Sequence, residues 1–200
     1  MTHVVFDIGN VLVRWEPKIA FRHAFESDAQ IDVFFDEIGF FDWNLAQDGG
    51  RGRAEGVALI AKRWPHYRDL IEGYFDRFGD VVANRIEGSW TILHELRDRG
   101  TRVFGLTNWA KDTWPIGVER HADLKDVFED VVVSGFANML KPDREIFDLL
   151  CTRNQLTPQD CLFIDDSKTN VDGAISAGWQ GHHFTSPHML RADLSERGLL

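Results

Sequence analysis

Five short apolar runs constrain this fold more than any other feature of the sequence. Each is rich in β-branched or aromatic residues and ends in polar or glycine-rich sequence; they cover residues 3–6, 102–106, 130–133, 161–164 and 181–184. Helical patterns lie between the later runs, at residues 89–99, 142–153 and 171–177, and the second of these begins with Pro142 at its first position. Strands that alternate with helices in this way predict an α/β fold built on a parallel sheet.

The pattern changes between about Trp15 and Arg85, where strand signals vanish. Helical patterns cover residues 20–25, 29–38, 53–64 and 66–78, and a glycine-rich turn is expected at residues 47–52. A helical block inserted after the first strand is expected to cover the C-terminal edge of the sheet. The predicted domains are therefore a core of residues 1–14 and 86–200 and a helical cap of residues 15–85.

Charge and composition narrow the class of partner. The 200 residues include 44% hydrophobic residues, and 32 acidic against 22 basic residues give a formal net charge of −10. Such a surface repels phosphate backbones and anionic headgroups, so nucleic acid and membrane are not expected partners. A small anionic metabolite remains possible with local help from a cation.

Cysteine usage and the N-terminal sequence bear on the compartment. Cys151 and Cys161 lack the spacing of a disulfide framework and are expected to be free thiols. The N-terminal residues do not show the basic segment and long apolar stretch of a signal peptide. These features predict a cytoplasmic protein, and nothing in the sequence indicates its oligomeric state.

Reactive residues follow four of the predicted strands. Asp7 ends the first, Thr107-Asn108 ends the second, Lys141 comes after the third, and Asp165-Asp166 ends the fourth. Singly, each has an ordinary explanation as a turn residue, a helix cap or a solvated lysine. Because ligands bind at the C-terminal ends of strands in open α/β sheets, we expect these side chains to meet in one crevice.

These motifs carry a resemblance to the haloacid dehalogenase superfamily, over nearly the whole chain. The first motif is residues 4–12 (VVFDIGNVL), the second 106–108 (LTN), the third 141–142 (KP) and the fourth 163–167 (FIDDS). The resemblance implies a Rossmann-like core with a small inserted α-helical cap. The form Asp-x-Gly-Asn-Val is similar to a subgroup of sugar-phosphate phosphatases that includes an α-glucose-1-phosphatase.

The resemblance also implies roles for the residues. Asp7 would attack phosphorus to form an aspartyl-phosphate, Thr107 and Asn108 would bind the phosphoryl oxygens, and Lys141 would neutralise their charge. Mg²⁺ would be held by the Asp7 carboxylate, the Gly9 backbone carbonyl and the acidic pair Asp165-Asp166, of which Asp166 is the preferred direct ligand.

Gly9 departs from the pattern of most phosphatases in this superfamily. They carry a second aspartate at this position as general acid and base, a function typically worth about 10²–10⁴-fold in rate. The Gly9 backbone carbonyl remains available to a metal, but the proton donor is lost. Substrates with good leaving groups, such as anomeric sugar phosphates, are therefore expected to be preferred.

Three alternatives share the scaffold. An L-2-haloacid dehalogenase would use Asp7 to attack carbon, but it needs no metal and rarely keeps two acids in the fourth motif. Phosphonate hydrolysis would require a cap lysine, and neither Lys18 nor Lys62 is distinctive. A catalytically decayed binding protein would have no reason to retain Asp7, Lys141 and both acids. The sequence favours the phosphatase.

Cap residues are expected to select the substrate, because they close over the crevice. Trp43, Asn44, Gln47 and Asp48 lie just before Gly49-Gly50 and are the candidates, with Trp43 and Gln47 predicted to bind substrate. Trp109, directly after the second motif, is expected to border the entrance.

Overall fold

A five-stranded parallel sheet forms the centre of the protein. The computed structural model describes residues 2–200, and its strands lie in the order β3-β2-β1-β4-β5. Their bounds are β1 His3–Phe6, β2 Val103–Thr107, β3 Val131–Val133, β4 Cys161–Asp165 and β5 Gln180–His183. All neighbouring pairs are parallel, with Val5 of β1 opposite Phe104 of β2 and Phe163 of β4. The predicted α/β fold and its five strands are confirmed.

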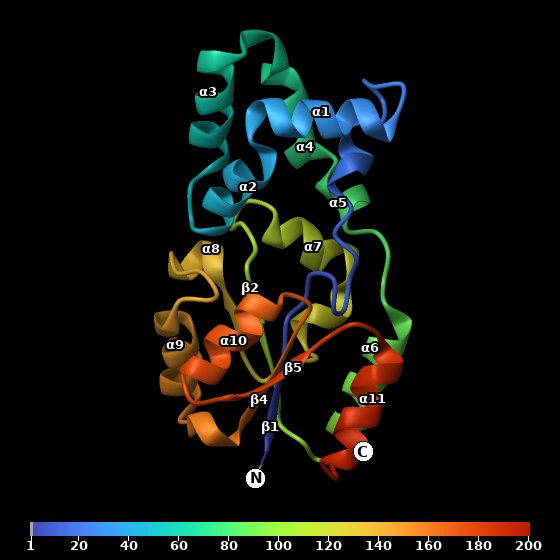
Figure 1. The fold of residues 1–200 in the computed structure, drawn as a ribbon, viewed down its shortest axis with the longest axis vertical. Coiled ribbons are helices and arrows are strands. Elements are labelled where there is room, and N and C mark those ends of the chain that lie inside the picture. The colour runs from blue at the N-terminus through green and yellow to red at the C-terminus, as the bar shows by residue number, and fades with distance from the viewer. Residues whose placement is uncertain (1) are drawn as a thin grey trace.

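Helices cover both faces of the sheet (Figure 1). They are α6 Glu87–Asp98 and α11 Pro187–Glu196 on one side, and α8 Ser134–Ala137, α9 Arg144–Asn154 and α10 Lys168–Ser176 on the other. Helix α7 Trp114–Arg120 and the 3-10 turns Ala122–Lys125 and Pro158–Asp160 complete this part. Alternate residues of β1 serve different cores, since Val5 packs with the α9 and α10 side chains while Val4 and Phe6 pack on the opposite face.

The residues between β1 and α6 form a helical block beyond the carboxyl edge of the sheet (Figure 1). It contains a 3-10 helix Pro17–Phe21, α1 Asp28–Ile38, α2 Phe40–Asp48, α3 Arg53–Arg63, a 3-10 turn Pro65–Tyr67, α4 Arg68–Asp76 and α5 Phe78–Val81. Buried aromatic rings hold the block together: Phe35 stacks on Phe40, and Phe21 stacks on Tyr74. We keep the name cap for residues 15–85; its independence as a domain stays a prediction.

Three expected boundaries are wrong. Gln47 and Asp48, predicted as a turn, are the last two residues of α2, which the sequence pattern did not indicate. Pro142 is not the first residue of a helix, because α9 begins at Arg144 after an extended Asp143. Of the predicted helix at residues 20–25, only Ala20 and Phe21 belong to the 3-10 helix.

Cys151 and Cys161 are both free, as predicted, and both are buried. Within residues 2–200, no helix has the length and apolar character that crossing a bilayer requires.

Candidate active site

Asp7 directly follows β1 and lies at the bottom of a cavity between the sheet and the cap. Its backbone N–H extends the pairing with β4 by donating to the Ile164 carbonyl at 2.8 Å. Its Oδ1 accepts from the Ile8 N–H at 2.7 Å and lies 3.0 Å from the Lys141 Nζ. Only 10% of the side chain is exposed. The carboxylate is therefore held in one orientation, with its remaining free side toward the cavity.

The Lys141 ammonium joins two carboxylates. It donates to Asp165 Oδ2 at 2.7 Å and to the Leu106 carbonyl at 3.1 Å, in addition to its contact with Asp7. An ammonium has three N–H donors, so each of them has an acceptor. Burial alone would lower the pKa of Lys141, but the neighbouring carboxylates outweigh burial and the net shift is upward. Lys141 is a buried permanent cation.

Asn108 fixes the backbone that carries this lysine. Its Nδ2 donates to the Lys141 carbonyl at 3.0 Å, and its Oδ1 accepts from the Lys141 N–H at 2.9 Å. The reciprocal pair links the end of β2 to the loop before α9. Asn108 also lines the cavity, so it can contact a ligand as well as position Lys141.

The two acids after β4 have different surroundings. Asp165 is fully buried and accepts from Lys141, from the Ser167 N–H at 2.7 Å and from Asn170 Nδ2 at 3.1 Å. Asp166 is half-buried and lines the cavity. Asp165 therefore orients the ammonium, while Asp166 faces the cavity.

Asn10 and His183, which the sequence did not single out as site residues, support Asp166. The Asn10 side chain bonds to the Asp166 carboxylate, and His183 Nε2 lies 3.0 Å from the Asp166 carbonyl. Asn10 has φ 55°, a conformation that asparagine adopts more readily than most residues.

Three carboxylates lie close enough to share one cation. One oxygen each from Asp7, Asp165 and Asp166 can be chosen so that all lie within 4.8 Å of one another. Burial raises the pKa of Asp7, with Asp165 and Asp166 adding to the effect against the attraction of Lys141. Burial and then Asp165 likewise raise the pKa of Asp166. Such crowded carboxylates remain ionised when a hard divalent cation lies among them, so the donor set fits Mg²⁺.

Thr107, the last residue of β2, has no exposed surface, and its Oγ1 has no hydrogen-bond partner within the described residues. A buried hydroxyl without a partner is unfavourable by about 1–3 kcal/mol. At the carboxyl end of a central strand, beside Asn108, such a donor is available to a bound anion.

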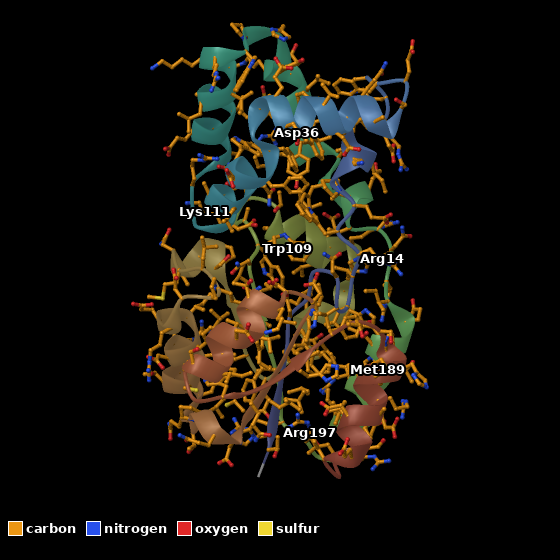
Figure 2. All side chains as sticks on the ribbon, viewed as in Figure 1. Arg14, Asp36, Trp109, Lys111, Met189 and Arg197 are labelled. Atoms are coloured by element: carbon orange, nitrogen blue, oxygen red, sulfur yellow. The ribbon has the colours of Figure 1, made fainter. Side chains whose placement is uncertain are left out.

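The cavity has a volume of about 190 Å³ and walls from both parts of the chain. The core supplies Asp7, Gly9, Asn10, Asn108, Trp109 and Asp166, and the cap supplies Trp15, Asn44, Asp48, Phe78 and Val82. Trp109 lies where the helical block meets the sheet-bearing part (Figure 2). A cavity smaller than the roughly 300–1,000 Å³ of drug-sized pockets is suited to a small ligand.

The structure does not bring Trp43 and Gln47 to this cavity. Trp43 is 5% exposed and donates from Nε1 to the Gly56 carbonyl at 2.9 Å. Gln47 is 1% exposed and bonds to Arg51 and to the Gly52 carbonyl. Both serve the interior of the cap. The adjacent residues of α2, Asn44 and Asp48, face the cavity instead.

This geometry agrees with what comparison with known proteins finds. A family model of haloacid dehalogenase-like hydrolases matches residues 1–178. The chain belongs to the haloacid dehalogenase-like hydrolase family. The resemblance carried by the four motifs is confirmed at this level, and the sugar-phosphatase subgroup stays a prediction.

Curated relatives of this chain have names that denote different activities. Drimenol cyclase drtB of Aspergillus calidoustus is 24% identical over 98% of this chain and 38% of its own length. A phosphoglycolate phosphatase of Nitrosospira multiformis is 32% identical over 60% of this chain and 51% of its own length. The alignments thus span about two fifths to one half of these relatives.

A solved structure shares the fold. A HAD family enzyme of Bacteroides thetaiotaomicron, crystallised with magnesium and inorganic phosphate, superposes with a TM-score of 0.71 at 20% identity. The superposition covers 93% of this chain and 95% of that one.

Proposed function

We propose that this hydrolase is a Mg²⁺-dependent phosphatase of a small phosphorylated metabolite, acting through an aspartyl-phosphate on Asp7. One observation carries the proposal: Asp7, at the bottom of the cavity, lies 3.0 Å from the Lys141 ammonium and shares a three-carboxylate cluster with Asp165 and Asp166. Phosphoryl transfer depends mainly on positioning and charge neutralisation, and these are the properties that the cluster provides. The phosphatase relative and the neighbour crystallised with magnesium and phosphate support the assignment.

Each residue of the site has a separate role in the proposed phosphoryl transfer. The free Asp7 oxygen attacks phosphorus, the bond to the leaving oxygen breaks, and water then hydrolyses the aspartyl-phosphate. Lys141 reduces the repulsion between the carboxylate and the phosphoryl group, and the Thr107 hydroxyl and Asn108 bind phosphoryl oxygens. Bound Mg²⁺, held by Asp7, Asp166 and the Gly9 carbonyl, would neutralise negative charge on these oxygens.

The dehalogenase alternative is disfavoured by the charges of the site. Halide displacement needs a cation that receives the leaving halide, whereas the Lys141 ammonium that contacts this cluster already binds Asp7 and Asp165. That reaction would use Asp7 but needs no metal, so it gives no role to Asp166 as a cation ligand. A decayed enzyme is disfavoured because burying Lys141 with its carboxylate partners carries a desolvation cost, and apolar residues could replace them once the function is lost.

The cavity suggests the substrate class. Aromatic side chains of Trp15, Phe78 and Trp109 form walls around the polar floor, and the volume suits a molecule of about one sugar ring. We therefore favour a sugar phosphate.

A substrate screen tests the proposal. Phosphate release from p-nitrophenyl phosphate, glucose 1-phosphate and glucose 6-phosphate is measured with and without Mg²⁺, with Asp7→Asn as the blank. We expect Mg²⁺-dependent release that the blank lacks. Metal-independent chloride release from 2-chloropropionate, or no turnover of any phosphate ester, would contradict the proposal.

A further inference from the structure

A phosphatase of this kind needs a proton at the leaving oxygen, and Gly9 cannot provide it. As the phosphorus–oxygen bond breaks, negative charge develops on the leaving oxygen, and an ordinary alkoxide departs far faster when it is protonated. The fold does not exclude a side chain at this position, because a Cβ at Gly9 would meet no atom within 4 Å. The proton donor can therefore be sought among the other groups that face the cavity.

The cavity is lined by three ionisable side chains, all of them aspartates: Asp7, Asp166 and Asp48. In the proposed function Asp7 is the nucleophile and Asp166 binds the cation, so neither is free to carry a proton. The third lies on the opposite wall, at the end of α2.

We propose that Asp48, supplied by the cap, is the general acid and base of this enzyme and replaces the residue missing at Gly9. This inference rests on the proposed phosphatase function. It assigns a chemical step to the cap, which otherwise serves only to enclose and select the substrate.

A chain of hydrogen bonds orients the Asp48 carboxyl group. Trp15 Nε1 donates to the Tyr74 hydroxyl at 3.3 Å, and that hydroxyl donates to Asn44 Oδ1 at 3.1 Å. Because its oxygen is taken by Tyr74, the Asn44 amide turns its NH₂ group toward Asp48 and donates to Oδ2 at 3.0 Å. Trp15 and Asn44 also line the cavity, so the chain runs along its cap wall.

Asp48 is also attached to the core. The Ser134 hydroxyl, at the start of α8, donates to the Asp48 carbonyl at 2.6 Å, and the Ala110 N–H donates to its carboxylate. These contacts fix the end of α2 over the loop that follows β2, where Asn108 and Trp109 line the cavity. Asp48 is thus placed relative to the core and is not left on a mobile surface.

The protonation equilibrium of Asp48 suits both halves of the reaction. Burial raises the pKa of Asp48 to about 7, against the opposing effects of the Ala110 N–H and the Lys141 ammonium. The other charged groups that share the cavity are the carboxylates of Asp7 and Asp166. Near neutral pH the Asp48 carboxyl group can both give and take a proton.

The reaction has two steps. In the first, an Asp7 oxygen bonds to phosphorus, the electron pair of the broken bond stays on the leaving oxygen, and Asp48 gives that oxygen its proton, which releases the alcohol. In the second, water bonds to phosphorus and gives a proton to the Asp48 carboxylate, and the electron pair of the broken bond returns to the Asp7 carboxylate. The products are an alcohol and phosphate.

The test compares leaving groups in Asp48→Asn. The asparagine oxygen can still accept from the Ala110 N–H, so the attachment to the core is kept while the proton is lost. We expect turnover of glucose 6-phosphate, which has an alkoxide leaving group, to fall by about 10²–10⁴-fold. With p-nitrophenyl phosphate the initial burst of nitrophenolate should stay within about threefold, and the later steady-state rate should fall because the aspartyl-phosphate waits for a base. Asp42→Asn, an exposed aspartate of the same helix, is the matched control and should change neither rate.

Each outcome separates this inference from the proposed function. Equal loss with both substrates, including the burst, would show that Asp48 is structural and would overturn the inference, as would unchanged turnover of glucose 6-phosphate. The retained burst also shows that the variant is folded. If the unmodified enzyme turns over no phosphate ester, the proposed function itself fails.

Discussion

The two walls of the cavity differ in physical character. The core wall is backed by a charge network in which the Lys141 ammonium pairs with both Asp7 and Asp165, and all three side chains are almost completely buried. The cap wall is mainly aromatic and amide surface with a single carboxyl group, that of Asp48. Under the proposed mechanism the two walls have separate tasks: the core would neutralise charge, and the cap would supply the shape of the cavity and the proton.

The largest effect is expected for Asp7→Asn. Loss of a nucleophile should reduce turnover of every phosphate ester by on the order of 10⁴–10⁶-fold. The asparagine oxygen can still accept from the Ile8 N–H, so the fold should persist, as circular dichroism would show. If Asp7→Asn lost activity toward only some esters, the core wall would also be selecting the substrate, and the proposed separation of tasks between the two walls would be wrong.

Lys141→Met should damage both chemistry and stability. Turnover should fall by about 10²–10³-fold, as when one electrostatic donor is removed. Removing one partner of a buried ion pair should lower the free energy of unfolding by about 3–5 kcal/mol, measured by urea denaturation.

Lys168→Met is the control for that variant. Lys168 pairs with Asp172 on an exposed helix face, at side-chain exposures of 70% and 56%. Its loss should change stability by less than about 1 kcal/mol. If both substitutions lowered the free energy of unfolding equally, burial of the Lys141 ion pairs would not account for their contribution to stability.

Thr107→Val should separate activity from stability within the core wall. The buried hydroxyl makes no hydrogen bond with any of residues 2–200, so its removal should leave the free energy of unfolding unchanged or slightly higher. Turnover should fall by about 10²-fold because a donor to the phosphoryl group is lost. Lower stability with unchanged turnover would assign Thr107 to packing.

Neighbouring cap residues should behave in opposite ways. Asn44→Leu removes a side chain that lines the cavity and orients Asp48, so turnover of glucose 6-phosphate should fall by about tenfold. Trp43→Phe removes a buried bond to the Gly56 carbonyl, so the free energy of unfolding should fall by about 1–3 kcal/mol with kinetics nearly unchanged. A kinetic loss in Trp43→Phe with unchanged kinetics in Asn44→Leu would show that the face of α2 that carries Trp43, and not the face that carries Asn44, contacts the substrate.

The smallest effect concerns pH. The pKa of Asp48 in the folded protein is raised to about 7, so the folded state holds this proton more tightly than the unfolded chain does. This contribution is fully present at acid pH and is lost as pH rises from about 4 to about 7. The Tm of Asp48→Asn relative to the unmodified protein should therefore rise across that range by a few degrees, in EDTA. A constant difference would contradict the raised pKa.

The residues of the core wall could be predicted from the sequence more completely than those of the cap wall. The core residues follow strands whose apolar runs are easy to detect, and parallel topology brings their ends together. Asp7, Asn108, Lys141 and Asp166 were therefore expected at one edge of the sheet, and the structure places them there.

The cap wall was harder to predict because α2 has no clear apolar stripe. Phe40 and Trp43 of this helix are buried, but Phe41 and Leu45 are exposed, so periodicity does not show which side faces inward. Trp43 and Gln47 are followed directly by Asn44 and Asp48, respectively, so a rotation of α2 about its axis by one residue would exchange the pair that faces the cavity. Packing of Trp43 against Tyr74 and Phe75, which are distant in sequence, sets this rotation.

The most direct measurement asks where the phosphoryl group goes. The enzyme is mixed with ³²P-labelled p-nitrophenyl phosphate and Mg²⁺, quenched in acid within one turnover, and digested for peptide mapping. We predict an acid-stable, hydroxylamine-sensitive label on the peptide that carries Asp7, absent in Asp7→Asn. Phosphate released with no label on the protein at any time, or a label on another residue, would contradict it.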